Sequence, residues 1–204
     1  MRYTGPKAKI CRKIGVNIYG SDKYDRILQR KPYGPGKGPR TRGGKKSEYA
    51  QQLMEKQKVR ETFGVSERQF KRYYSSAQKS SEPPGQMILR LLETRLDNIL
   101  YRAGFSLTRF QSRQMAAHGL FLVNGRRCTI PSRSMKLGDV IEVRPRSLSS
   151  VLFSTILDAT EKYVPPPWLK VDPNKLRIEI LSPPAEENLE QGLDVQKVVE
   201  LYSR

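Results

Sequence analysis

The stretch LETRLDNILYRAGFSLTRFQSRQMAAHGLFLVNGRRCTIPS covers residues 92–132 and decides the fold. Its apolar residues first recur at helical spacing and then alternate with a period of two, which is typical of a half-buried strand. The dipeptide Asn124-Gly125 lies in the alternating part and is a strong short-range signal for a β-hairpin. KLGDVIEVRP follows, with a Gly138-Asp139 turn before another strand. We therefore expect helices followed by a small antiparallel sheet.

Two helices are predicted on either side of Gly104. The first is one continuous amphipathic helix, because apolar residues recur every three or four positions from Ile88 to Ala103. Gly104 stands where a glycine commonly ends a helix. Thr108 and Gln111 form a capping box that opens the second helix.

Capping residues also predict helices outside this stretch. Ser47 can cap a helix that runs to about residue 63, and Ser66 with Gln69 forms a capping box for the next. Asp194 can cap a closing helix, and residues 148–163 have a helical pattern. WLKV and KLRIEIL have the pattern of short strands. The predicted fold class is α+β, with a helical lobe and a module of two helices and a small antiparallel sheet.

Composition divides the chain into three parts. Residues 1–46 are expected to form a basic extended arm, because KPYGPGKGPRTRGGKK cannot bury enough apolar area to fold alone. Residues 47–86 are expected to form a helical lobe with residues 190–204, since the apolar face of VVELYSR needs a partner. Residues 87–189 are expected to form a second lobe that contains the module of helices and hairpin, at about 93–155.

The chain is strongly basic, with 38 Lys and Arg, 20 Asp and Glu, and a formal net charge of +18. Residues 1–60 carry 17 basic and 4 acidic side chains, whereas residues 147–204 carry 6 and 9. This imbalance favours a polyanionic partner, which could be RNA, DNA or an anionic membrane face. No apolar run approaches the ~20 residues that cross a bilayer, and the N-terminus lacks the apolar segment of a secretory signal.

The decisive stretch resembles the RNA-binding module named after the fourth ribosomal protein of the small subunit. The resemblance is carried by R-L-D-N-x-x-Y-R, by R-x-x-x-R-Q, and by V-N-G-R followed by L-G-D. The module also occurs in tyrosyl-tRNA synthetases, pseudouridine synthases and a small heat-shock RNA-binding protein, so alone it indicates only RNA binding. RYTGPK, KPYGPG, SEYAQQLMEKQKVRETFGVSERQF and ELYSR are similar to the bacterial-type ribosomal protein. The chain is identified as a member of that family over almost its whole length.

The resemblance implies a structural constituent of the small ribosomal subunit without catalysis. It implies primary binding to the 5′ domain of 16S-class ribosomal RNA, nucleation of subunit assembly and an influence on decoding accuracy. The implied partners are small-subunit ribosomal RNA, neighbouring small-subunit proteins, notably the fifth, and messenger RNA where it enters the subunit, with no membrane. The implied location is the cytoplasmic small subunit, and an organellar ribosome stays an alternative.

The predicted RNA surface combines basic and polar side chains of the module with those of the arm and the helical lobe. Arg109 and Arg113 are one helical turn apart, so their planar guanidinium groups can span neighbouring phosphates. Asp97 could instead pair within the fold with a neighbour, namely Arg95, Tyr101 or Arg102. The full predicted set is Arg95, Asn98, Tyr101, Arg102, Arg109, Arg113, Gln114, His118, Asn124, Arg126, Arg127, Arg40, Arg42, Lys45, Lys46, Lys58, Arg68 and Arg72.

The two cysteines, Cys11 and Cys128, are far apart and are interpreted as reduced thiols, although a disulfide between them stays an alternative. Many members of the family carry four cysteines near the N-terminus that hold zinc. Here the first pair of positions holds Ala8 and Cys11, and the second pair is absent from NIYGSDKYDRILQRKPY. Structural zinc takes four N or S ligands, so we predict no zinc, no other cofactor, and a buried or interfacial Cys11.

Rival functions explain less of the chain. A pseudouridine synthase needs a catalytic domain, and the 58 residues after position 146 are too few for one. The sequence also lacks a nucleophile elbow, a phosphate-binding loop, a dinucleotide-binding motif and a zinc-protease motif. A free-standing RNA chaperone needs only the module and is the main alternative, but it leaves the helical region and the basic arm unexplained. A DNA-binding or membrane-surface protein would explain the charge but not the module.

Overall fold

The chain forms two compact units. The computed structural model describes residues 3–36, 38, 44, 47–148, 150, 153 and 163–203. Unit 1 comprises Met1–Gln86 with Gln191–Arg204, and unit 2 comprises Met87–Glu190. Within the described ranges, none of the helices combines the length and the apolarity that crossing a membrane requires.

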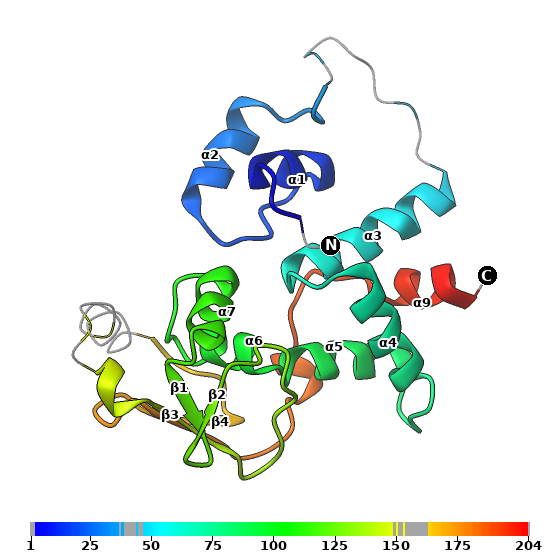
Figure 1. Ribbon diagram of the computed structural model, residues 1–204. Coiled ribbons are helices and arrows are strands. Elements are labelled where there is room, and N and C mark those ends of the chain that lie inside the picture. Colours follow the sequence, from blue (N-terminus) through cyan, green and yellow to red (C-terminus); the bar gives the residue numbers. More distant parts are fainter. Residues whose placement is uncertain are drawn as a thin grey trace. The chain divides into compact units, whose positions relative to one another are not determined.

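Unit 1 is helical in the part of the chain that the structure describes (Figure 1). The Ser47 hydroxyl accepts a hydrogen bond from the Ala50 amide at 3.3 Å, and the Ser66 hydroxyl accepts one from the Gln69 amide at 3.4 Å. Both predicted caps are therefore confirmed. The helices are α1 (Lys7–Ile14), α2 (Asp22–Arg30), α3 (Glu48–Thr62), α4 (Glu67–Ala77), the start of α5 (Pro84–Glu93) and α9 (Val195–Ser203).

The prediction that residues 1–46 form an extended arm is wrong for residues 3–36, which contain α1 and α2. Cys11 of α1 is fully buried. The Arg12 side chain donates to the carbonyl of Tyr33 at 3.0 Å and to that of Gly34 at 3.3 Å, and its guanidinium lies over the Tyr33 ring. These bonds attach the KPYG segment to α1. Composition cannot predict these bonds, because the Arg12 side chain binds backbone carbonyls about twenty residues away in the sequence.

The closing helix α9 packs against α3. Its predicted cap is confirmed, because the Asp194 carboxylate accepts a hydrogen bond from the Lys197 amide at 3.3 Å. The Tyr202 ring stacks on the Tyr74 ring with a centroid distance of 4.5 Å, and its hydroxyl donates to Glu67 at 2.9 Å. Tyr202 near the end of the chain thus packs against α4, and Val198 of α9 is fully buried.

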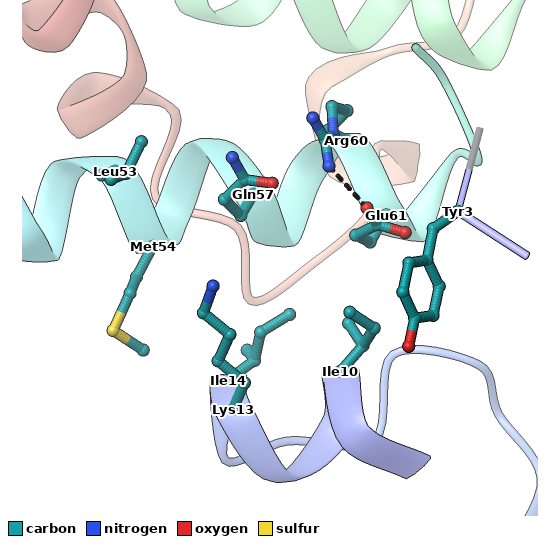
Figure 2. Close-up of a pocket in the computed structure, with 9 residues that line it drawn as sticks. All are labelled: Tyr3, Ile10, Lys13, Ile14, Leu53, Met54, Gln57, Arg60 and Glu61. Carbon is teal, nitrogen blue, oxygen red and sulfur yellow. Dashed lines mark hydrogen bonds and ion pairs between the residues drawn. The ribbon is translucent and has the colours of Figure 1, made fainter. Parts of the chain in front are cut away.

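A pocket of about 320 Å³ lies between α1 and α3 (Figure 2). Ile10 and Ile14 of α1 face α3 across it, and Arg60 and Glu61 of α3 form an ion pair of 2.7 Å at its wall. The contact between α1 and α3 is therefore incompletely filled. The other lining residues are Tyr3, Lys13, Leu53, Met54 and Gln57.

In the described part of the chain, unit 2 combines the end of α5 and the helices α6 and α7 with a five-stranded antiparallel sheet. The strand order is β2-β1-β3-β5-β4, so β2 and β4 form the two edges. Both helices pack against the sheet through a shared apolar core (Figure 1). The predicted α+β class is confirmed. The elements are α6 (Leu96–Arg102), α7 (Arg109–Ala117), β1 (Phe121–Val123), β2 (Arg126–Cys128), β3 (Val140–Val143), η1 (Pro145–Ser147), β4 (Leu169–Asp172), β5 (Arg177–Ile180) and η2 (Glu186–Asn188).

The core of unit 2 joins residues of α6, α7 and the five strands. Leu96 of α6, Ile141 of β3 and Trp168, just before β4, are all buried in it. Phe153 packs its ring edge-on against Phe121, with a centroid distance of 6.1 Å. The other residues of the helix predicted over 148–163 lie mostly outside the described residues.

The prediction of one continuous helix over residues 88–103 is wrong, because α5 and α6 are separate helices. The Met135 amide donates to the Thr94 carbonyl at 2.9 Å, and Arg95 forms a β-bridge with Ser134. The loop between β2 and β3 thus takes backbone groups that a continuous helix would use itself. The apolar spacing continues across the break, so it could not indicate the interruption.

The predicted hairpin is confirmed, with Asn124 and Gly125 at φ values of 51° and 75° between β1 and β2. The Asn124 side-chain amide donates to the Asp139 carboxylate at 2.8 Å, and its oxygen accepts from the Val140 amide at 2.8 Å. Asn124, predicted as an RNA contact, therefore uses its side chain to attach the hairpin turn to the start of β3.

We expect Tyr202→Ala to lower the free energy of unfolding by about 2–3 kcal/mol, because it removes a partly buried stacked ring and a hydrogen bond. Tyr202→Phe keeps the ring and is expected to cost only about 0.5–1.5 kcal/mol. Urea unfolding followed by far-ultraviolet circular dichroism measures both. Equal stability of the two variants would show that the stacked ring contributes nothing.

We expect Asn124→Ala to destabilise unit 2 by about 2–3 kcal/mol, since it places a Cβ residue in the left-handed region and removes two hydrogen bonds. Asn124→Gly tolerates the backbone conformation and isolates the hydrogen bonds, at about 1–2 kcal/mol. Thermal unfolding monitored by the fluorescence of Trp168, the single tryptophan, reports on this unit. A glycine variant as stable as the parent would contradict a role for the side-chain bonds.

Candidate nucleic-acid interface

Helix α7 carries two of the predicted arginines on a capped, well-defined start. The Thr108 hydroxyl accepts from the Gln111 amide at 3.2 Å, which confirms the predicted cap. The Gln111 side chain reaches back to the amide of Leu107 at 3.0 Å. These bonds fix the first turn of α7, which begins at Arg109. Arg113 lies one turn further along the helix.

Arg95 and Asn98 lie inside unit 2, with 0% and 2% of their surface exposed. The Arg95 guanidinium donates twice to the Asp97 carboxylate, at 2.9 and 2.6 Å. The Asn98 side chain donates to both the carboxylate and the backbone carbonyl of Glu93. The alternative that Asp97 pairs with Arg95 is thus confirmed. We remove both residues from the predicted RNA surface, because burial leaves them nothing to present to a partner in solution.

The Asp97 carboxylate bridges two arginines from different elements. In addition to Arg95, it accepts from Arg113 of α7 at 3.0 Å. About a quarter of the Arg113 side chain remains exposed, compared with 1% for Arg95. Arg113 therefore connects the interior network to the surface, and only its outer part is available to a partner.

Arg102 and Arg109 form a second ion-pair group with two glutamates. Arg102 donates to Glu93 at 3.0 and 2.6 Å and to Glu190 at 2.8 Å. Arg109 pairs with the same Glu190 oxygen and lies 4.4 Å from the centre of the Tyr101 ring. Burial alone would lower the pKa of Arg102, but the bonds from Glu93 and the charge of Glu190 raise it above its ordinary value. Arg102 therefore remains cationic in this setting.

The C-terminal end of α7 and the hairpin form an exposed polar strip, defined here as Gln114, His118, Arg126 and Arg127. The side chains of Gln114 and His118 are joined at 2.8 Å. The Arg127 guanidinium donates to the His118 carbonyl at 3.2 Å, and Gly119 leaves room for it because a Cβ there would clash with the guanidinium. These contacts bring together Gln114, His118 and Arg127, three residues predicted separately from the sequence, and Arg126 is exposed as the neighbour of Arg127 on β2.

The predicted residues of unit 1 fall into three groups. Arg68 and Arg72 are exposed on α4, one turn apart. Lys58 is engaged within the unit, by the Gly192 carbonyl and by Glu55 at 3.5 Å. The remaining predicted residues, Arg40, Arg42, Lys45 and Lys46, lie outside the described residues.

The acidic partners, Glu93 and Glu190, were not predicted from the sequence. Glu93 is fully buried, and Glu190 is separated from Arg102 by 88 positions. No spacing rule relates these residues, because the pairing requires the break after α5 and the return of the chain beside α6. Arg133 and Lys136 were also missed, although both are exposed basic residues in the loop between two predicted strands.

Cys11 has the properties of a buried thiol rather than a metal ligand. Burial raises the pKa of the Cys11 thiol, whereas zinc binds the thiolate. Within the part of the chain that the structure describes, no group of three or more His, Cys, Asp or Glu side chains gathers as a metal site. Cys11 and Cys128 are both free.

Comparisons with known proteins cover nearly the whole chain. Residues 2–93 match the ribosomal protein S4/S9 N-terminal domain, and residues 94–141 match the S4 domain. The small ribosomal subunit protein uS4 of Roseiflexus sp. is 43% identical over 206 residues, covering 100% of this chain and 99% of that protein. The uS4 protein of Persephonella marina is 44% identical over 205 residues, covering 99% and 98%. That of Borrelia hermsii is 39% identical over 199 residues, covering 97% and 96%.

These matches confirm the family that the sequence motifs indicated. The boundary between the two matched domains lies at residues 93 and 94, where α5 ends and the structure breaks the helix. Proteins of the family are structural components of the ribosome, so the prediction of a chain without catalytic activity is also confirmed. This chain belongs to the uS4 family of small ribosomal subunit proteins.

Proposed function

We propose that this chain is a primary binder of the 5′ domain of the small-subunit ribosomal RNA and helps nucleate assembly of the subunit. The observation that carries the proposal is the exposed polar strip on unit 2. Its residues lie on the capped helix α7 and on the hairpin of β1 and β2. An A-form RNA helix presents phosphates, 2′-hydroxyls and a shallow minor groove, so its recognition depends on a rigid surface of matching shape.

The strip combines the two chemistries that such recognition uses. Arg126 and Arg127 carry planar guanidinium groups that suit bidentate contact with phosphate oxygens. Gln114 and His118 can exchange hydrogen bonds with 2′-hydroxyls. The outer part of Arg113 and the exposed side chains of Arg133 and Lys136 are further cations that unit 2 can offer to phosphates.

Unit 1 supplies the second contact in this proposal. Arg68 and Arg72 form an exposed basic pair on α4, and the basic segment of residues 40–46 adds Arg40, Arg42, Lys45 and Lys46. A chain that binds RNA through two separate basic surfaces can hold two RNA helices at once, which favours the fold of a multi-helix junction. This is the physical basis that we propose for an early role in assembly.

The family resemblance extends the proposal to three further roles. It suggests the fifth small-subunit protein as a neighbour, contact with messenger RNA where it enters the subunit, and an influence on decoding accuracy. We assign no residue of this chain to these roles.

The full chain is expected to bind a 5′-domain ribosomal RNA fragment at least about a thousandfold more tightly than tRNA at physiological salt, at the lower end of the usual ratio of specific to non-specific affinity for nucleic acid. Filter binding with excess unlabelled tRNA measures this ratio. Log K should also fall with log salt by about 0.7–0.9 for each phosphate neutralised. Equal affinity for both RNAs would contradict the proposal.

Arg126→Ala is expected to weaken binding to the 5′-domain fragment about 5- to 30-fold, as for the loss of one charge-assisted contact of about 1–2 kcal/mol. Lys175→Ala is the matched control, because it removes one exposed positive charge beside β4 at the opposite edge of the same sheet. The control should change affinity less than about twofold, because the two edges are separated by more than a Debye length of about 8–10 Å. Equal losses for both variants would show that only net charge matters.

A further inference from the structure

Two arginines of unit 2 converge on a single carboxylate oxygen. Arg102 of α6 and Arg109 of α7 both donate to Oε2 of Glu190, Arg102 at 2.8 Å. Each guanidinium group also binds a second side chain within unit 2. Arg102 makes two bonds with the buried Glu93, and Arg109 donates to the Asn98 oxygen at 2.8 Å. Two cations whose donors point at one oxygen atom have the geometry of an anion-binding site.

The Tyr101 ring lies against the Arg109 guanidinium. The Arg109 guanidinium carbon lies 4.4 Å from the ring centre, a distance at which the ring attracts the cation. Neither arginine therefore depends on Glu190 alone for its position. Arg102 keeps Glu93, and Arg109 keeps Asn98 and Tyr101, if the Glu190 carboxylate leaves.

The charge of the group depends on Glu190. With Glu190 in place, Arg102 and Arg109 face Glu93 and Glu190, and the formal charges cancel. Without Glu190 the group carries one net positive charge. An RNA phosphate that approached the occupied group would meet a neutral site and a neighbouring carboxylate of its own sign, which disfavours contact.

Glu190 is also the member of the group that can leave most easily. It lies on the irregular segment after η2, whereas both arginines belong to helices. A quarter of its side chain is exposed, compared with 0% for that of Glu93. Withdrawal of Glu190 would therefore break no helix and no strand, and it would return the carboxylate to solvent.

We propose that Arg102 and Arg109 form a phosphate-binding site that the Glu190 carboxylate occupies in the free protein, and that an RNA backbone phosphate displaces it on binding. The proposal rests on the proposed function, since it adds a contact to that RNA surface. It gives Glu190 the role of an internal competitor, which lowers affinity for any RNA because phosphate contacts carry little sequence information.

The test compares Glu190→Gln with Glu187→Gln in the full chain. Both variants remove one negative charge from the same segment, but Glu187 is exposed and lies in η2. Glutamine at 190 keeps a side-chain oxygen for the two arginines and loses only the charge. Affinities are measured by filter binding for both the 5′-domain fragment and tRNA, with the melting temperature recorded for each variant.

Glu190→Gln is expected to bind both RNAs about three- to tenfold more tightly than the parent, as for the removal of one close like charge. Glu187→Gln should stay within about twofold of the parent. In an Arg109→Ala background the gain from Glu190→Gln should shrink, because the two residues act through one site. A general effect of net charge would persist in that background.

Two results would overturn the inference. Glu190→Gln could match Glu187→Gln on both RNAs, which would show that the carboxylate does not compete with phosphate. It could instead bind more weakly and melt at a lower temperature, which would make Glu190 a positioning residue for the arginines. A loss of preference for the 5′-domain fragment over tRNA in the parent chain contradicts the proposed function alone, since the comparison of variants can still be made on either RNA.

Discussion

The buried pairing of Arg95 with Asp97 is the interaction on which unit 2 depends. Arg95 lies at the break between α5 and α6, where its backbone bridges to Ser134 and its side chain is fully enclosed. Asp97 neutralises it and also accepts from Arg113 of α7. One carboxylate thereby connects the loop after β2, the start of α6 and the middle of α7. Removing Asp97 would take away the carboxylate that neutralises the buried Arg95, and breaking a buried ion pair in this way typically costs about 3–5 kcal/mol.

This network separates the arginines of the module into two kinds. Those that hold the fold face acidic side chains in the interior, and those of the polar strip face solvent. The separation explains how a lobe with many cations stays compact, because the inward-facing arginines share the carboxylates of Asp97, Glu93 and Glu190. It also explains why two residues of the predicted RNA surface, Arg95 and Asn98, are buried. The rigid interior orients the strip, and the strip remains available to an external anion.

Local features of the fold were predictable because their causes are local. The caps at Ser47, Ser66 and Thr108 and the turn at Asn124-Gly125 depend on residues within four positions of each other. The family was predictable because several motifs occur in order along the chain. The helix break after α5 and the helices α1 and α2 were not predicted. Each depends on partners distant in the sequence, such as Met135 for Thr94.

The sequence by itself determined the α+β class, the hairpin module, the uS4 family and the basic character that suits a nucleic-acid partner. Only the tertiary structure decided which charged side chains face inward. Arg95 and Arg126 are both arginines in a basic stretch, and the sequence does not distinguish them. In the structure Arg95 is buried with Asp97, whereas Arg126 is exposed. The physical reason is that an ion pair forms between side chains that folding brings together, and Glu190 meets Arg102 across 88 positions. Periodicity and composition depend on residues that are near each other in the sequence. The pairing of charges depends instead on which side chains are close in the folded structure.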